Sequence, residues 1–263
     1  IGPNYKKNLP EQNVLNWAPS VMFRYMFNKQ HVLMFRYRGR SSTPNIEDLQ
    51  EVIDITDPMN LRYGNPNLKP SFNNNFTLDY RKFVPESMRS YSANLYYTST
   101  LNSVANRMTY DPQTGARVYK KENVNGNWQA RGFFSFNTPL KNKKFTISSN
   151  TNARFSDAVS YTSVGSSKNA DQELSTTHNL GLGERFTSSY RSEVFDISLS
   201  GSVNYNLVRN SKQENSNRET FDYYIGGNTN VNLPWQVSIS TDINCRFKDG
   251  YTGGLNNNEV MWN

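Results

Sequence analysis

The sequence predicts an all-β fold, an up-and-down meander of antiparallel strands, and three observations carry this prediction. Apolar and polar residues alternate over long runs, and turn residues separate one run from the next. Helical signals are almost absent. Aromatic residues make up 13% of the chain although the mean hydropathy is −0.77. This aromatic content argues against disorder and fits strands with one wet face.

Residues 235–248 give the clearest predicted strand. From Trp235 to Phe247 every second residue belongs to an apolar face, while polar residues such as Ser240 and Asp242 lie between them. A period of two over this length is incompatible with a helix. The same pattern occurs in residues 193–207 and 72–80. Weaker alternation predicts further strands near residues 17–27, 31–42, 88–108, 124–137, 145–156, 176–187 and 220–233.

The connections between these strands alternate in length. Short turns are predicted near residues 28–30, 85–87, 138–144, 188–192 and 233–235. Long loops are predicted at 43–70, 109–123, 157–175, 208–219 and 249–258, with one short helical turn at Ile46–Ile53. Short turns at one end and long loops at the other are the layout of an outer-membrane barrel. We therefore expect about ten strands of a larger transmembrane β-barrel. Aromatic residues near strand ends predict interfacial girdles: Trp17, Tyr37, Tyr80, Tyr97, Trp128, Phe155, Tyr190, Tyr223 and Trp235.

Composition excludes several other classes of protein. The net charge is +7, but Lys and Arg are scattered singly, which argues against nucleic-acid binding. The chain has one cysteine, Cys245, and two histidines, His31 and His178, which offer no zinc spacing. No nucleophile elbow or phosphate-binding loop is present in the sequence. We therefore expect no enzymatic activity, no cofactor and no metal.

The string Gly64-Asn65-Pro66-Asn67-Leu68-Lys69-Pro70 resembles the G-N-P-x-L-x-P motif in the barrel of TonB-dependent receptors. Upstream, Pro44-Asn45-Ile46 and Leu49 are similar to the family's "Pro-x-Ile-x-x-Leu", and Pro19-Ser20 resembles its strand start. The Asn- and Tyr-rich style is that of Bacteroidetes-type barrels. Ser71 departs from the acidic residue that usually follows the motif. The resemblance is specific over about residues 14–82, and no plug domain or TonB box is visible. Because about ten strands cannot close a receptor barrel of about 22 strands, residues 1–263 are interpreted as a partial barrel domain.

The resemblance implies an outer-membrane receptor of a Gram-negative bacterium that takes up a scarce nutrient. The implied substrates are a ferric siderophore, cobalamin or an oligosaccharide. The implied partners are outer-membrane lipid, a plug domain and TonB in the full-length protein, and a surface lipoprotein. Two alternatives stay open. One is a receptor-like surface binding or adhesion protein without TonB-driven transport, and the other is a soluble carbohydrate-binding β domain.

Three groups of residues are candidates for function. Residues opposite the apolar faces are expected to line the lumen: Asn73, Asn75, Asp79, Arg81, Arg131, Asp196, Asn204, Asp242 and Arg246. Four residues are expected to lie in extracellular loops and to take part in capture of the solute: Tyr110, Arg117, Tyr161 and Tyr251. The structural motif is Gly64, Asn65, Pro66, Leu68 and Pro70, whose prolines fix φ and whose glycine is expected to adopt a positive φ. We interpret the motif as a stiff loop end that sets the register of the next strand. Ile239 is expected near the middle of the hydrocarbon layer.

Overall fold

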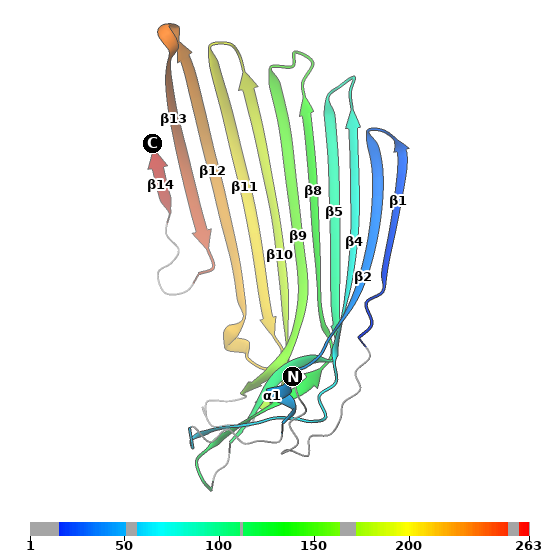
Figure 1. The fold of residues 1–263 in the computed structure, drawn as a ribbon. Coiled ribbons are helices and arrows are strands. Elements are labelled where there is room, and N and C mark those ends of the chain that lie inside the picture. Colours follow the sequence, from blue (N-terminus) through cyan, green and yellow to red (C-terminus); the bar gives the residue numbers. More distant parts are fainter. Residues whose placement is uncertain (1–15, 51–56, 111–112, 164–171, 252–257, 263) are drawn as a thin grey trace.

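The computed structural model describes residues 16–50, 57–110, 113–163, 172–251 and 258–262. Within these residues, eleven antiparallel strands form one sheet and follow each other across it in chain order (Figure 1). They are β1 (Ser20–Asn28), β2 (His31–Ser42), β4 (Ser71–Val84), β5 (Arg89–Leu101), β8 (Asn127–Pro139), β9 (Phe145–Ser163), β10 (Gln172–Arg191), β11 (Phe195–Asn210), β12 (Arg218–Leu233), β13 (Val237–Asp249) and β14 (Glu259–Trp262). The predicted meander is confirmed. The described part of the sheet is open, with β1 and β14 at its edges.

A second, three-stranded sheet lies at the long-loop end of the molecule, at the bottom of Figure 1. It consists of β3 (Asn60–Tyr63), β7 (Arg117–Val124) and β6 (Ser103–Tyr110), in that order. The helix α1 (Ile46–Leu49) lies in the same loop region. Two short 3₁₀ turns connect strands of the main sheet: η1 (Glu214–Ser216) lies between β11 and β12, and η2 (Pro234–Gln236) lies between β12 and β13. Residues 51–53 of the predicted helical turn lie outside the described residues. We call the β3-β7-β6 sheet the loop platform.

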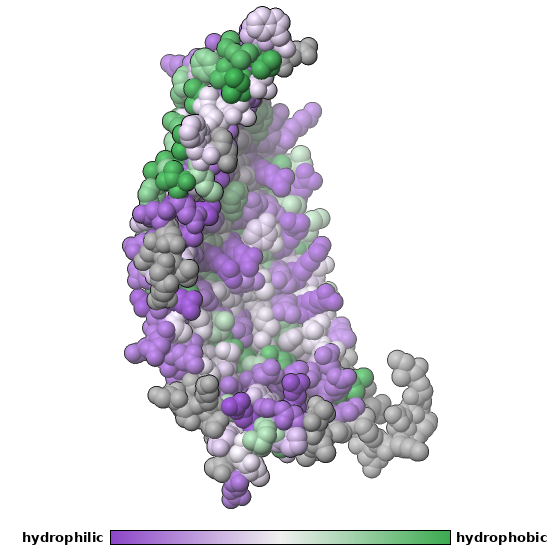
Figure 2. Space-filling model, turned by 90° about the vertical axis from the view of Figure 1, so that its left-hand side faces the viewer, coloured by the Kyte–Doolittle hydropathy of each residue, from purple (hydrophilic) through white to green (hydrophobic). Residues whose placement is uncertain are grey.

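One face of the main sheet is apolar and uncovered. Large side chains on it are widely exposed, including Leu95 at 54%, Leu199 at 62% and Ile225 at 64%. Figure 2 shows hydrophobic residues gathered on the upper left-hand side and hydrophilic residues projecting from the right-hand side. A water-soluble protein rarely exposes so large an apolar surface. Lipid is the solvent that suits such a face.

Aromatic side chains form rows near both ends of this apolar face. Toward the long loops, Tyr37, Phe76, Tyr97 and Trp128 follow each other across four strands, with ring centroids 4.8–6.1 Å apart. Toward the short turns, Tyr190 lies between Phe145 and Phe195. Amphipathic rings at two heights are typical of the two membrane interfaces. Among the described residues, no helix is long and apolar enough to cross a membrane.

Three predicted long loops are partly wrong, and so is one predicted strand. The predicted loop at 43–70 contains β3, and the single strand predicted at 88–108 is two strands, β5 and β6, of different sheets. Residues 109–123 include most of β7, and much of the predicted loop at 157–175 is strand, because β9 runs to Ser163 and β10 begins at Gln172. The outer part of β9 is polar on both faces, with Asp157 and Tyr161 on one and Ser160 on the other. Alternation disappears where both faces are wet, although the hydrogen-bond ladder continues. The strands therefore project well beyond the apolar belt.

The predicted turn at 233–235 is confirmed, but the last long strand begins two residues later than predicted, at Val237. Trp235 does not belong to β13 but to the turn Pro234–Gln236, where its φ is 67° and its side chain is 91% exposed. The left-handed region is unusual for a bulky residue, so this turn is strained. The alternating pattern extended into the turn by one apolar residue, which is why periodicity alone misplaced it.

Candidate functional site

The polar face of the main sheet collects all nine residues predicted to face the lumen. Directly paired residues of antiparallel strands share a face, and the register connects the nine from β4 to β13 without a break. They are Asn73, Asn75, Asp79 and Arg81 on β4, Arg131 on β8, Asp196 and Asn204 on β11, and Asp242 and Arg246 on β13. In a closed barrel this face is the interior. Contact of any of them with a ligand stays a prediction.

Some of these side chains hold the wall together. Asp79 is 5% exposed and accepts hydrogen bonds from Arg36 Nη2 at 2.7 Å and Asn94 Nδ2 at 2.6 Å. Asn73 and Asn75 each accept a bond from a threonine hydroxyl of β5, at 2.7 and 3.0 Å. A carboxylate with two such donors is already satisfied. These three residues therefore cross-link β2, β4 and β5.

Other members of the nine are similarly occupied at the far side of the sheet. Asp242 Oδ2 accepts a bond from Asn244 Nδ2 at 2.7 Å. Asp196 Oδ1 forms only an ion pair, 3.6 Å from Arg191 Nε near a short turn, and accepts no hydrogen bond within the described residues. Asn204 fills the space above Gly183, where a Cβ would lie 2.6 Å from its Oδ1. Arg81, Arg131 and Arg246 are exposed. The exposed cations of this face are thus more available to a ligand than its acids are.

A hollow of about 570 Å³ lies on the polar face across β5, β8 and β9. Its lining includes Arg131 and Arg154, which are directly paired, and two rings, Tyr96 and Phe133. A second hollow of about 640 Å³ on the same face is lined by Arg36, Arg38 and Arg40 of β2, with Asn75 and Thr77. The wall is therefore rich in guanidinium groups in both hollows. Arg154, Tyr96 and Phe133 were not predicted, although both rings break the alternation at polar positions and that break was a usable signal.

The loop platform contains a third hollow, of about 670 Å³. Tyr63 and Tyr119 line it together with charged residues of both signs. Lys121 Nζ lies 2.6 Å from Asp48 Oδ1, which joins β7 to α1. Because β3 pairs in parallel with β7, residues about sixty apart in the chain become neighbours here. Polar and aromatic groups of this kind can hold a hydrated solute.

The four predicted loop residues are brought together only in part. Tyr110 of β6 and Arg117 of β7 are a directly paired couple on the loop platform. Tyr161 of β9 donates its hydroxyl to Glu122 Oε2 at 2.7 Å, which ties the platform to the main sheet. Tyr251 lies beyond β13 and donates to both carboxylate oxygens of Asp222, at 3.0 and 2.9 Å. Two of the four are therefore structural contacts, and a ligand contact by any of them stays a prediction.

The motif at residues 64–70 fastens the loop platform to the start of β4. Asn65 Nδ2 donates to the Lys121 carbonyl at 2.8 Å, and the Lys69 amide donates to Asn123 Oδ1 at 2.7 Å. Leu68 is 3% exposed, so its side chain anchors the segment. The prolines Pro66 and Pro70 stand beside these anchors. The motif thus fixes where a long loop re-enters the wall.

Gly64 does not adopt the positive φ that the sequence predicted for it. Its φ is not in the left-handed region, since the described glycines with positive φ are Gly115, Gly126 and Gly250. Instead, a Cβ at Gly64 would lie 1.8 Å from the Gln50 carbonyl oxygen. Close backbone approach, and not an unusual φ, requires glycine at this position.

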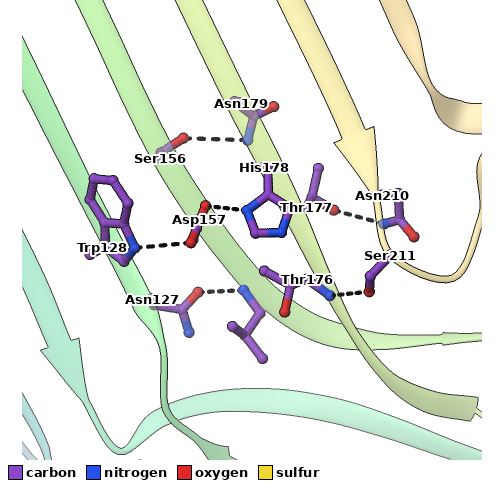
Figure 3. A network of polar contacts seen from close by, with 11 residues as sticks. Asn127, Trp128, Ser156, Asp157, Thr176, Thr177, His178, Asn179, Asn210 and Ser211 are labelled. Atoms are coloured by element: carbon purple, nitrogen blue, oxygen red, sulfur yellow. Dashed lines mark hydrogen bonds and ion pairs between the residues drawn. The ribbon is translucent and has the colours of Figure 1, made fainter.

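On the apolar face, a polar cluster ends the aromatic row toward the long loops (Figure 3). Asp157 accepts a bond from Trp128 Nε1 at 3.0 Å and lies 2.6 Å from His178 Nδ1. Nearby, Asn127 Oδ1 accepts the Val159 amide at 2.8 Å. Ionisable groups are costly in hydrocarbon, so this cluster indicates the height at which lipid gives way to water.

One carboxylate interrupts the apolar face below that height. Glu184 lies on β10 midway between Tyr190 and His178, and its neighbours on β9, Ser149 and Thr151, donate their hydroxyls to it. An isolated acid on this face has no periodic signal, so sequence reasoning missed it. The two hydroxyl donors offset part of the cost of placing a carboxylate against lipid.

These features define a class of protein. A meander with an uncovered apolar belt, two aromatic rows and a polar opposite face is part of the wall of a membrane β-barrel. Residues 4–180 match the outer membrane protein beta-barrel family, and the chain belongs to that family. The outer membrane of Gram-negative bacteria is therefore its location. No curated protein matches the chain, and no solved structure does.

Proposed function

We propose that the chain is the wall of an outer-membrane receptor that imports a scarce nutrient with energy supplied through TonB. The observation that carries the proposal is the anchored motif at residues 64–70, which holds the loop platform over the long-loop end of a polar wall. Long loops at that end of a barrel face the outside of the cell. The platform would capture a solute there, and the polar face would line its path.

Uptake by cells that carry the full-length protein tests this proposal. Deletion of the gene should abolish uptake of one of three labelled solutes: a ferric siderophore, cobalamin or an oligosaccharide. A protonophore should abolish it too, because TonB-driven transport requires the proton gradient. Uptake that persists without the gene, or that ignores the protonophore, would refute the proposal.

A matched pair of variants tests the role of the motif. Asn123→Ala removes the partner of the Lys69 backbone and should lower uptake. Asn142→Ala, in a short turn at the opposite end, removes a comparable side-chain bond to backbone amides and should leave uptake unchanged. Equal surface amounts of the two variants make the comparison valid.

Surface binding or adhesion without transport is the second candidate. The exposed loop platform, with its hollow and its two tyrosines, favours it, because capture needs nothing further. Binding of a solute by whole cells that survives a protonophore, with no accumulation inside, would favour this candidate. A soluble carbohydrate-binding domain is not supported, because the chain belongs to an outer-membrane family.

A further inference from the structure

Two aromatic rings lie exposed on the polar wall, where lipid does not explain them. Tyr96 of β5 is 45% exposed and Phe133 of β8 is 41% exposed, and both line the hollow of about 570 Å³. Every other lining position supplies polar side chains or the backbone of the sheet. Apolar rings in water cost free energy unless something packs on them. They therefore provide a surface for the flat face of a ring.

Two guanidinium groups lie beside these rings. Arg131 and Arg154 are direct cross-strand partners, so their Cβ atoms are roughly 5 Å apart. Within the described residues neither forms an ion pair, and Arg131 Nη2 donates instead to the neutral Gln129 Oε1, at 3.1 Å. Adjacent like charges destabilise a sheet. An oxyanion between them would relieve the repulsion and accept a forked set of hydrogen bonds.

The remaining lining groups suit a hydroxylated ligand. Gln129 and Asn152 supply amides, and Thr98 supplies a hydroxyl, around the same hollow. A volume of about 570 Å³ is within the range of roughly 300–1,000 Å³ that is usual for small-molecule sites. Rings, cations and neutral polar groups thus converge at one place on the wall.

We propose that this hollow binds a ring that carries an oxyanion. The ring face packs on Tyr96 and Phe133, and the oxyanion lies between Arg131 and Arg154. This deepens the proposed function by naming the class of solute, and it rests on that function for its biological role. Two sources share this chemistry, a uronic-acid sugar and an aromatic carboxylate, and the test separates them.

Binding to the purified full-length protein in detergent, measured by calorimetry, tests the site. The probes are trigalacturonate, 2,3-dihydroxybenzoate and the neutral maltotriose. One of the two anionic probes should bind at least tenfold more tightly than maltotriose. Arg131→Gln, Arg154→Gln and Phe133→Ala should each weaken that probe by about tenfold or more. Preference for trigalacturonate identifies the sugar source, and preference for dihydroxybenzoate identifies the aromatic source.

Arg24→Gln is the matched control, because Arg24 is an exposed arginine of the same face on β1, outside the hollow and outside the predicted lumen residues. It should leave binding unchanged, and equal weakening by this variant would overturn the proposal in favour of a general attraction of anions. Failure of both anionic probes to bind would also overturn it, including the case in which another part of the full-length protein covers the hollow. The measurement needs no proton gradient, so binding without energised uptake would refute the proposed function and leave this site standing.

Discussion

Placing a charge on the apolar face of β13 should destabilise the protein in proportion to its depth in the membrane. Ile243 is the central residue of β13 and is 49% exposed, whereas Ile239 is the third residue after the turn. Ile243 lies six residue steps after Val237, which is about 20 Å along a strand and about 15 Å in depth at a tilt of roughly 40°. Half of an apolar belt of about 25 Å is about 12 Å, so Ile243 lies near the midplane. Ile239, which the sequence placed near the midplane, lies closer to the interface, and that expectation is corrected.

The expected cost follows from this depth. Ile243→Arg should lower the free energy of unfolding by about 2–4 kcal/mol, and Ile239→Arg by about 0–1 kcal/mol. Ser240→Arg, on the polar face, should change it little. Denaturant titration of the full-length protein refolded into lipid vesicles measures all three. Equal destabilisation by Ser240→Arg and Ile243→Arg would refute the assignment of faces, and equal destabilisation by the two isoleucine variants would refute the assignment of depth.

Three further perturbations address the loop end. Gly64→Ala should lower the free energy of unfolding by more than 1 kcal/mol through collision with the Gln50 carbonyl, as denaturant titration would show, and unchanged stability would contradict the close approach. Burial, and then the hydrogen bond to Asp222, raise the pKa of Tyr251 above its ordinary value of 10.0. This contact therefore stabilises the fold below about pH 10, and its contribution is lost as the pH rises through the higher folded pKa. Tyr251→Phe should remove that alkaline loss of stability, which is measured by denaturant titration across this pH range alongside the absorbance of tyrosinate. An epitope inserted at residues 211–217 should be reached by antibodies on whole cells, and detection only after lysis would reverse the topology.

The wall was predictable because one physical rule governs it. A strand with lipid on one side and water on the other must alternate, and Phe72 to Tyr80, Phe195 to Leu207 and Val237 to Phe247 do so. All nine predicted polar residues share one face for the same reason. The rule also shows where prediction ends, since β9 and β10 continue as strands after their alternation has stopped.

The loop platform was not predictable from periodicity. β3 has four residues and pairs in parallel with β7, which lies more than fifty residues further along the chain. No local pattern encodes a pairing of that separation. The role of Gly64 was missed for a related reason, because the atom it must avoid belongs to Gln50, and only the folded loop brings the two together. Glu184 and Phe133 each break the alternation of apolar and polar residues. Such positions are not needed to form the strand, so they point to candidate functional residues.

The separation of the loop platform from the main sheet has a consequence for how such proteins diversify. The platform has its own hydrogen-bonded ladder and meets the wall largely through side chains such as Asn65, Asn123 and Tyr161. Substitutions on its solvent-facing positions leave the strand register of the wall untouched. Relatives can therefore exchange the residues that meet the environment while inheriting the membrane-spanning part unchanged, provided that these few fastening residues are retained.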